Sequence, residues 1–381
     1  MNNPMEGLFQ LIHKIEDTRQ SGKVLHKLDD ILLLTISAVI SGAEGWEDIV
    51  DFGDHHKDWL KCFGDFSAGI PSADTVARVI EHIDPNAFRR FFSTWMKRCH
   101  RLTKGEVVPI DGKTLRRACN KGDPDSVVHM VSAFATANGV VLAQVKTDSK
   151  SNEITAIPEL LNLLNLKGCL VTFDAMGCQK KIAQLLLDQR ADYLFQVKAN
   201  HPRLFELFQQ EYSLVKLSQI TKNTLHTKDQ AHGRDECRSY LVVPITQNPA
   251  FDDIAKEWPG IKSLGIVISS RVERGADVEH LEVRYFISSA ELSVKRFARA
   301  CRAHWQIENK LHWSLDVAMN EDESRIRVGH APEILAGIRH IALNLLRQAP
   351  FKAGIRRKQR RALMDETFRT QVMMLARLDT P

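Results

Sequence analysis

The order of strands and helices between residues 106 and 197 is the feature that most constrains the fold. Three β-rich runs come first, VVPIDGKTLR, VVHMVSAFAT and VVLAQVKTD, and the last two are separated by Asn138 and Gly139. Asn-Gly between two such runs is a strong hairpin signal. Helical and β-rich segments then alternate over residues 154–164, 169–173, 179–188 and 193–197. This order predicts a mixed α/β domain built on five strands.

Two acidic residues stand at the ends of strands in this pattern. Asp111 follows the apolar run VVPI, and Asp174 follows CLVTF. The order of the elements is that of a ribonuclease-H-like fold, in which the first and fourth strands lie side by side, so we expect the two acids to lie close together. Each acid alone also has an ordinary explanation: Asp-Gly is a common turn, and Asp174 can cap the helix after it.

A third acid, Glu308, lies on a predicted helix that begins after Ser293, a good N-cap, and runs to about Asp316. Residues spaced three and four apart place it on the apolar face of that helix. The members of this face are Val294, Phe297, Cys301, Trp305, Glu308, His312 and Leu315. A carboxylate there needs a hydrogen bond, a cation or a metal ion. The simplest partner is a nearby arginine such as Arg302.

Composition excludes several classes of protein. The longest strongly apolar stretch, residues 31–43, is shorter than the roughly 20 residues of a membrane-spanning helix. The N-terminus has no basic segment leading into an apolar one, so we expect no secretory signal and a cytoplasmic location. The seven cysteines are scattered and never spaced Cys-x-x-Cys, which argues against a disulfide framework and a zinc ribbon.

Basic charge is concentrated at the C-terminus. Residues 350–381 contain 8 Lys and Arg against 3 Asp and Glu, whereas residues 1–100 contain 11 against 15. A basic run near the end can neutralise nucleic-acid phosphates, or it can be a solvated terminal helix. It consists of Arg356, Arg357, Lys358, Arg360 and Arg361. The acidic first hundred residues have helical periodicity, for which packing or dimerisation is a simpler role than a DNA-binding helix-turn-helix.

Three segments, IDGKTLR, VTFDAMGCQKKIA and HWQIENKLHWSLDVAMNEDESRIR, resemble the DDE transposases of bacterial insertion sequences, specifically the H-repeat-associated subgroup found beside Rhs elements. The resemblance covers nearly the whole chain. It implies a ribonuclease-H-like catalytic core, a mixed five-stranded sheet with helices, interrupted by a β-rich insertion and preceded by a small helical domain. The expected segments are that helical domain (1–100), the first part of the core (101–200), the insertion (201–290), the second part of the core (291–349) and a basic tail (350–381).

By position, Asp111, Asp174 and Glu308 match the three acids of this family. The resemblance implies a Mg²⁺ site, which Mn²⁺ can also occupy, and cleavage of double-stranded DNA at the element ends followed by strand transfer to target DNA. Two ions roughly 3.5 to 4 Å apart would serve the attacking and leaving oxygens, with Asp111 bridging both. Because two DNA ends must be joined in concert, we expect a homodimer on DNA.

Basic residues near these acids are candidate DNA contacts. Many related transposases have an arginine four residues before the glutamate, where this chain has His304, with Arg302 two residues earlier. Either residue can take over the role of that arginine. Lys113, Lys198 and Arg325 lie near the acids in sequence or on flanking loops and can contact phosphates, although single basic residues are more often solvated surface.

Other readings of the same residues stay open on sequence alone. His304, Glu308 and His312 share a helical face at a spacing of four, as zinc ligands often do, so a zinc hydrolase is one rival. A transposase relic that binds DNA without cutting it is another. The acidic run at 321–323, within NEDES, is an alternative source of the third metal ligand.

Overall fold

The computed structural model describes residues 6–100, 102–118, 127–147, 153–218, 223–231, 234–273 and 279–375. The chain forms two compact units. The first unit comprises Met1–Arg101, Gly112–Leu164 and Glu308–Pro381, and the second comprises Leu102–Asp111 and Asn165–Ile307. Each unit is built from separated stretches of chain.

The second unit is built on a mixed sheet in the order β1-β4-β5-β9-β8-β7-β6. Strand β1 (Val107–Leu115) runs parallel to β4 (Leu170–Phe173), and β4 runs parallel to β5 (Asp192–Val197). The other strands are antiparallel: β6 (Thr224–Ala231), β7 (Arg234–Pro244), β8 (Ser263–Glu273) and β9 (Glu279–Ser288). Because β9 pairs directly with β5, the β-rich segment extends the same sheet and does not form a separate one.

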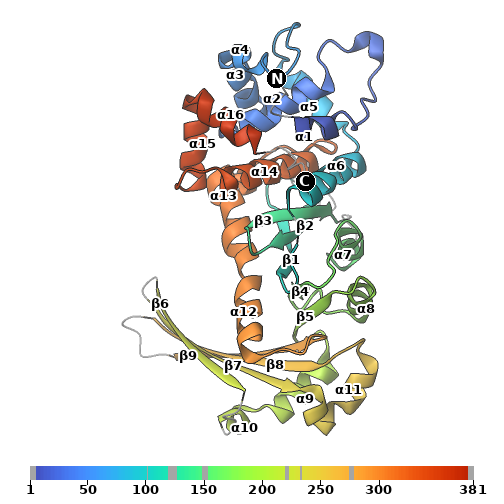
Figure 1. Cartoon of the computed structure of the whole chain (residues 1–381), viewed down its shortest axis with the longest axis vertical. Helices are drawn as coiled ribbons and strands as arrows, with labels where there is room; N and C mark the ends of the chain where they lie inside the picture. Colours follow the sequence, from blue (N-terminus) through green and yellow to red (C-terminus); the bar gives the residue numbers. More distant parts are fainter. Residues whose placement is uncertain are drawn as a thin grey trace. The chain divides into compact units, whose positions relative to one another are not determined.

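Helices lie on both sides of this sheet. α12 (Val294–His304) packs on one face, where Phe297 joins a buried cluster with Val107, Leu170 and Leu194 from three neighbouring strands. The other helices of the unit are α8 (Lys180–Asp188), α9 (Pro202–Glu211), α10 (Leu214–Ser218) and α11 (Asp252–Glu257), with 3-10 turns at Ile245–Gln247 and Pro249–Phe251. Figure 1 shows α9, α10 and α11 on the side of β7 and β8 away from α12.

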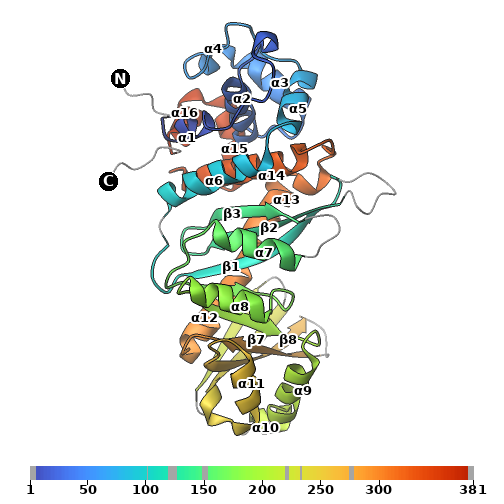
Figure 2. The same ribbon diagram turned by 90° about the vertical axis from the view of Figure 1, so that its right-hand side faces the viewer.

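The first unit combines helices with the hairpin formed by β2 (Val128–Ala135) and β3 (Val140–Lys146), and its strand order is β3-β2-β1. Strand β1 therefore contributes its first residues to one unit and its last residues to the other. The central helix is α14 (Ala331–Gln348), which is buried from Ala331 to Leu346. Figure 2 shows α14 and α6 running alongside β3, against which both pack.

The remaining helices of the first unit come from both ends of the chain, except α7, which lies in the middle stretch. They are α1 (Glu6–Ile12), α2 (Leu28–Ile40), α3 (Trp46–His55), α4 (Lys57–Leu60), α5 (Ala73–Glu81), α6 (Pro85–Cys99), α7 (Glu153–Asn162), α13 (Trp313–Met319), α15 (Ile355–Met364) and α16 (Glu366–Met374), with 3-10 turns at Ser21–Lys23 and Glu321–Glu323. The N-terminal helices α2 and α5 pack on α14, as do α15 and α16. The basic C-terminal segment is therefore folded over residues 355–374 and is not an extended tail.

Several local signals in the sequence are confirmed. Ser293, the N-cap expected from the sequence, accepts a hydrogen bond from Arg296 N at the start of α12. Gly139 has a φ of +69° in the turn between β2 and β3, a conformation that favours glycine. The mixed α/β class is confirmed as well. None of the helices in the described stretches is long and apolar enough to cross a membrane.

Candidate active site

Asp111 and Asp174 belong to the second unit and stand on neighbouring parallel strands. The register pairs Val107 with Leu170 and Pro109 with Thr172. Continued by two residues, this register places Asp111 opposite Asp174, just beyond the end of β4. Adjacent strands lie about 4.8 Å apart, and partners in a parallel register face the same side of the sheet. The sequence prediction that these two strands are neighbours is confirmed.

The alternative of an Asp-Gly turn at Asp111 is excluded, because Asp111 and Gly112 both lie within β1. A Cβ atom at position 112 would stand 2.1 Å from an oxygen of Glu153, the first residue of α7. No side chain larger than hydrogen fits there without moving Glu153. A glycine after Asp111 therefore allows α7 to approach this part of β1, and Asp111 itself stays in extended backbone.

Asp174 is held by the backbone that follows it. Its Oδ1 accepts hydrogen bonds from Met176 N at 2.9 Å and from Gly177 N at 3.3 Å. α8 begins only at Lys180, after Gln179 at its N-cap, so Asp174 caps the turn after β4 and does not cap the helix. With Oδ1 committed to the turn, Oδ2 is the atom that can face a cation.

His304 at the end of α12 stands close to these acids within the second unit. Its Nδ1 lies 2.9 Å from Thr172 Oγ1, two residues before Asp174 and on the same face of β4. Burial lowers the pKa of His304 to about 4, although the negative charge of Asp174 acts in the opposite direction. The ring is therefore neutral near pH 7 and one of its nitrogens is engaged inside the protein. Sequence reasoning missed Thr172, which was visible only as a polar residue in an otherwise apolar strand.

The donors fit a hard divalent cation. Carboxylate oxygens are the ligands that Mg²⁺ prefers, and Asp111 and Asp174 present them from one edge of the sheet. Of the three expected acids, the second unit holds these two. In the described part of the chain there is no group of three or more His, Cys, Asp or Glu side chains that could hold a metal ion. The third acid of the expected triad, Glu308, belongs to the first unit.

Glu308 lies in a π-helical turn, Ile307–His312, between α12 and α13. Its side chain is exposed, while Ile307 and Leu311 are fully buried. The prediction that Glu308 shares an apolar face was wrong for a physical reason. A π-helical turn bonds residue i to residue i+5, so it shifts the buried face relative to the spacing of a regular α-helix. Single π-turns inside helices are frequent at functional sites.

The π-helical turn also argues against a zinc site at His304, Glu308 and His312. The π-helical turn separates His304 from His312 and breaks the four-residue spacing on which the pattern depends. His304 is bonded to Thr172 in the second unit, whereas His312 belongs to the first. Burial, together with the positive charge of Lys113, lowers the pKa of His312 to about 4. Both rings are therefore neutral near pH 7.

Lys113, expected to contact phosphates, is instead the centre of an ion-pair network in the first unit. Its Nζ lies 2.6 Å from Asp316 Oδ1, 2.9 Å from Glu321 Oε2 and 2.9 Å from Asp322 Oδ1. Burial opposes its charge, but the carboxylates, Glu321 foremost, raise the pKa of Lys113 above its usual value. Since Arg117 pairs with Glu323 as well, the acidic run at 321–323 is neutralised by basic residues. That run is therefore a poor source of a metal ligand.

Two more candidate DNA contacts have partners within the protein. Lys358 is buried, and its Nζ donates to Leu346 O at 2.7 Å and to Ala349 O at 3.0 Å, at the C-terminal end of α14. Its assignment as a DNA contact was wrong, because it neutralises a helix terminus. Arg302 is exposed but forms an ion pair with Asp229 of β6. The candidates that remain exposed are Lys198, Arg325, Arg356 and Arg357.

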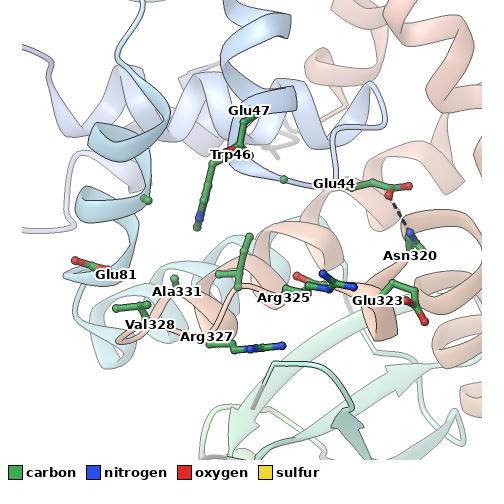
Figure 3. A pocket seen from close by; sticks show the side chains of 14 residues that line it. Glu44, Trp46, Glu47, Glu81, Asn320, Glu323, Arg325, Arg327, Val328 and Ala331 are labelled. Atoms are coloured by element: carbon green, nitrogen blue, oxygen red, sulfur yellow. Dashed lines mark hydrogen bonds between the residues drawn. The ribbon is translucent and has the colours of Figure 1, made fainter. Parts of the chain in front are cut away.

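A pocket of about 560 Å³ lies in the first unit between the start of α3, the end of α5 and the segment that follows α13. Figure 3 shows Trp46 pointing from α3 toward the segment that carries Arg325 and Arg327. The lining also contains four acids, Glu44, Glu47, Glu81 and Glu323. This acidic lining does not suit a phosphate backbone, so Arg325 can contribute to DNA binding only from the rim of the pocket.

Comparison with known proteins assigns the class. Residues 102–345 match the family described as Transposase DDE domain, and residues 9–96 match the one described as DDE_Tnp_1-associated. The chain belongs to the DDE transposase family. Membership implies a nucleic-acid-processing enzyme with DNA as its partner.

Within this family the chain belongs with the H repeat-associated proteins. It is 48% identical over 373 residues to "H repeat-associated putative transposase YhhI" of Escherichia coli K12, a match that covers 97% of this chain and 98% of that protein. It is also 48% identical over 371 residues to "Putative transposase YncI" of Escherichia coli O157:H7, covering 97% and 95%. A third relative, "Inactive transposase YbfQ" of strain K12, is 62% identical over 76 residues, which cover 20% of this chain and 90% of that protein.

Proposed function

We propose that this chain cleaves DNA at the ends of an insertion element and transfers the cut strand to target DNA, with Asp111, Asp174 and Glu308 as the metal-binding acids. The observation that carries the proposal is the shared register of β1 and β4, which brings Asp111 and Asp174 to one edge of the sheet. Two acids on adjacent parallel strands are a natural start for a site that holds a divalent ion.

The strand order supports a ribonuclease-H-like core for this chemistry. β1 borders β2 in the order β3-β2-β1 and borders β4 in the order β1-β4-β5. Strands β1, β4 and β5 are parallel, and β2 and β3 form an antiparallel hairpin. The β-rich strands β6 to β9 follow β5 in the chain and precede the helix that leads to Glu308. This is the arrangement that the insertion in such a core requires.

Each acid has a distinct task in the proposed reaction. When bound, a pair of Mg²⁺ or Mn²⁺ ions lowers the barrier to phosphodiester exchange by stabilising charge on the attacking and leaving oxygens. Asp111, in extended backbone, would supply carboxylate oxygens as ligands. Asp174, fixed by the turn at Met176 and Gly177, would hold one ion through Oδ2. Glu308, exposed in its π-helical turn, would complete the other site.

The surroundings of Asp174 support an orienting role for His304. Thr172 fixes one ring nitrogen of His304, and burial keeps the ring neutral, so His304 can hold a hydrogen bond near Asp174 without adding a competing positive charge. Phe297 of α12 lies nearby in a buried apolar cluster with Val107 and Leu170, which holds this helix on the sheet. His304 thus serves the site from within the protein rather than by gripping DNA.

DNA contacts in this proposal come from the exposed basic residues, Lys198, Arg325, Arg356 and Arg357. Arg302 can join them only by leaving Asp229. Because two element ends are cut and joined together, the working form is a homodimer on DNA. The protein would act in the cytoplasm, where the bacterial chromosome lies.

The direct test uses purified protein and a duplex carrying the inverted repeats that flank the gene. Wild-type protein is expected to nick this duplex with Mg²⁺ or Mn²⁺, and both Asp111→Asn and Glu308→Gln are expected to abolish nicking while still shifting the duplex in a gel. Asp188→Asn, an exposed aspartate at the end of α8, is the matched control and should nick normally. Nicking by both active-site variants at the wild-type rate would refute the assignment. Binding without nicking by wild-type protein would instead favour the relic.

A further inference from the structure

We propose that Lys113 is a positioning residue, which fixes the segment that follows Glu308 against residues 112–115 of β1, within the first unit. The inference rests on the proposed function, because it concerns how the third acid is held. Lys113 lies two residues after Asp111 in β1, so the two side chains share one face of that strand. Its partners lie on the segment that follows Glu308.

The network around Lys113 is balanced in charge and buried at its centre, whereas Arg116 at its rim is 79% exposed. The Lys113 side chain is 10% exposed and Glu321 is 2% exposed. Three carboxylates, Asp316, Glu321 and Asp322, face three cations. Besides Lys113, these are Arg116, which lies 3.2 Å from Asp322, and Arg339 of α14, which lies 3.8 Å from Glu321. A buried network of this kind holds a specific geometry, because every carboxylate that moves leaves a cation without its partner.

The contacts connect the strand to the helix by a short path. Asp316 lies on α13, which begins directly after the π-helical turn that contains Glu308. Glu321 and Asp322 lie on the 3-10 turn that follows α13. Lys113 therefore contacts the segment after Glu308 in two places, at α13 and at the 3-10 turn that follows it. A lysine is suited to this role because its ammonium has three donors. Lys113 donates to Glu321 and Asp322 and forms an ion pair with Asp316.

A second contact holds the same segment, and its partner, Glu44, comes from the N-terminal part of the chain. Asn320 ends α13 in the left-handed conformation, with a φ of +52°, and its Nδ2 donates to Glu44 Oε2 at 2.9 Å. Figure 3 shows this bond at the edge of the pocket. The end of α13 is thus fixed on both sides, which leaves the π-helical turn little freedom to relax into a regular α-helix. Such relaxation would rotate Glu308 away from its present direction.

The test maps where a bound metal ion lies, without relying on activity. Full-length protein is loaded with Fe²⁺ and treated with ascorbate and peroxide, so that radicals cut the backbone near the ion. We expect wild-type protein to be cut near residues 111, 174 and 308. In Lys113→Met the cut near 308 should weaken by about tenfold, the low end of what losing a supporting partner costs a metal site. The cuts near 111 and 174 should remain.

Three further variants complete the test. Lys113→Met combined with Glu321→Gln removes one charge of each sign. This double variant replaces Lys113→Met in the test if the single variant does not fold. Lys113→Arg keeps the charge and should restore the cut near 308. Arg117→Met, which breaks the exposed pair with Glu323, is the matched control and should cut like wild type.

The outcomes separate the two proposals. An unchanged cut near 308 in the folded Lys113→Met variant, or in the compensated double variant, overturns the positioning role while leaving the triad intact. Absence of cuts near 111 and 174 in wild-type protein overturns the metal site itself, and the positioning role falls with it. Loss of the cut near 308 in both variants, with recovery in Lys113→Arg, supports the inference.

Discussion

The two groups of acids in this protein are surrounded in opposite ways. Around Lys113, each carboxylate lies beside a lysine or an arginine, and the positive and negative charges cancel inside the first unit. In the second unit, Asp174 is met by two backbone N–H groups and stands near a neutral histidine, His304. Acids of the first kind hold the fold together. An acid of the second kind is still able to attract a metal ion.

The contrast also shows how misleading local charge density can be. The acidic run at 321–323 is the densest cluster of carboxylates near the expected site, yet basic residues from β1 and the segment after it neutralise all three side chains. Asp111 and Asp174 each follow an apolar run and are separated by 63 residues of sequence. Their importance comes from strand pairing and not from local composition.

The largest expected effect comes from removing the charge of Asp174. Asp174→Asn should lower DNA cleavage by about three orders of magnitude, equal to roughly 4 kcal/mol of transition-state stabilisation, because a neutral amide is a poor ligand for a hard cation. Its amide oxygen can still accept the bonds from Met176 and Gly177. Thermal unfolding should therefore change little, and single-turnover cleavage assays would measure the loss. A variant that keeps most of its cleavage rate would place Asp174 among the structural acids.

Glu321→Gln should show the opposite pattern, a loss of stability. Glu321 is almost fully buried between Lys113 and Arg339, and removing its charge leaves both cations short of a partner. We expect the free energy of unfolding to fall by about 3 kcal/mol. Urea denaturation would measure it, with Glu323→Gln as the control. Glu323 is half exposed, so its change should stay below about 0.5 kcal/mol. Equal effects in the two variants would contradict the buried network.

Part of this contrast could be predicted from the sequence. The pattern of strands and helices led to neighbouring strands for Asp111 and Asp174, because hairpins and short crossovers leave few ways to pair five strands. The direction in which Glu308 points could not be predicted in this way. A π-helical turn adds one residue to a helical turn without any mark in composition, and every later residue then changes face.

The roles of Lys113 and Lys358 lay beyond sequence reasoning for another reason. The carboxylates that bind Lys113 lie more than 200 residues away in the chain, and only the fold brings them together. Lys358 is part of a basic run that predicts a phosphate-binding surface. Its position on α15 nevertheless places it on the buried face of that helix, where it donates to Leu346 O at the end of α14. Because Lys358 is buried, the total charge of the run overstates the charge that is available to DNA.

Acid should destabilise the protein through its buried histidines. Burial, with the positive charge of Lys113 as the next cause, lowers the pKa of His340 in α14 from 6.5 to about 3. Below pH 6.5 His340 is protonated in the unfolded chain but stays neutral in the folded chain. The free energy of unfolding therefore falls as the pH drops from 6.5 toward 3. Between pH 6.5 and about pH 5, we expect the titration of His340 alone to lower the free energy of unfolding by about 2 kcal/mol.

Denaturation curves at several pH values would measure this dependence. His340→Gln should flatten it, and a slope that stays unchanged in the variant would contradict the assignment. His304 contributes in the same direction, because burial lowers its pKa to about 4. Part of the dependence should therefore survive in His340→Gln.

The smallest expected effect tests the hydrogen bond that orients His304. Thr172→Val keeps the shape of the side chain but removes the hydroxyl that faces His304 Nδ1 at 2.9 Å. We expect a loss of about 1 kcal/mol in the free energy of unfolding and a severalfold decrease in cleavage, because the ring next to Asp174 is no longer held in one orientation. Thr172→Ser retains the hydroxyl and should restore cleavage. If valine lowers stability and leaves the cleavage rate unchanged, then His304 belongs with the acids around Lys113, as a part of the fold alone.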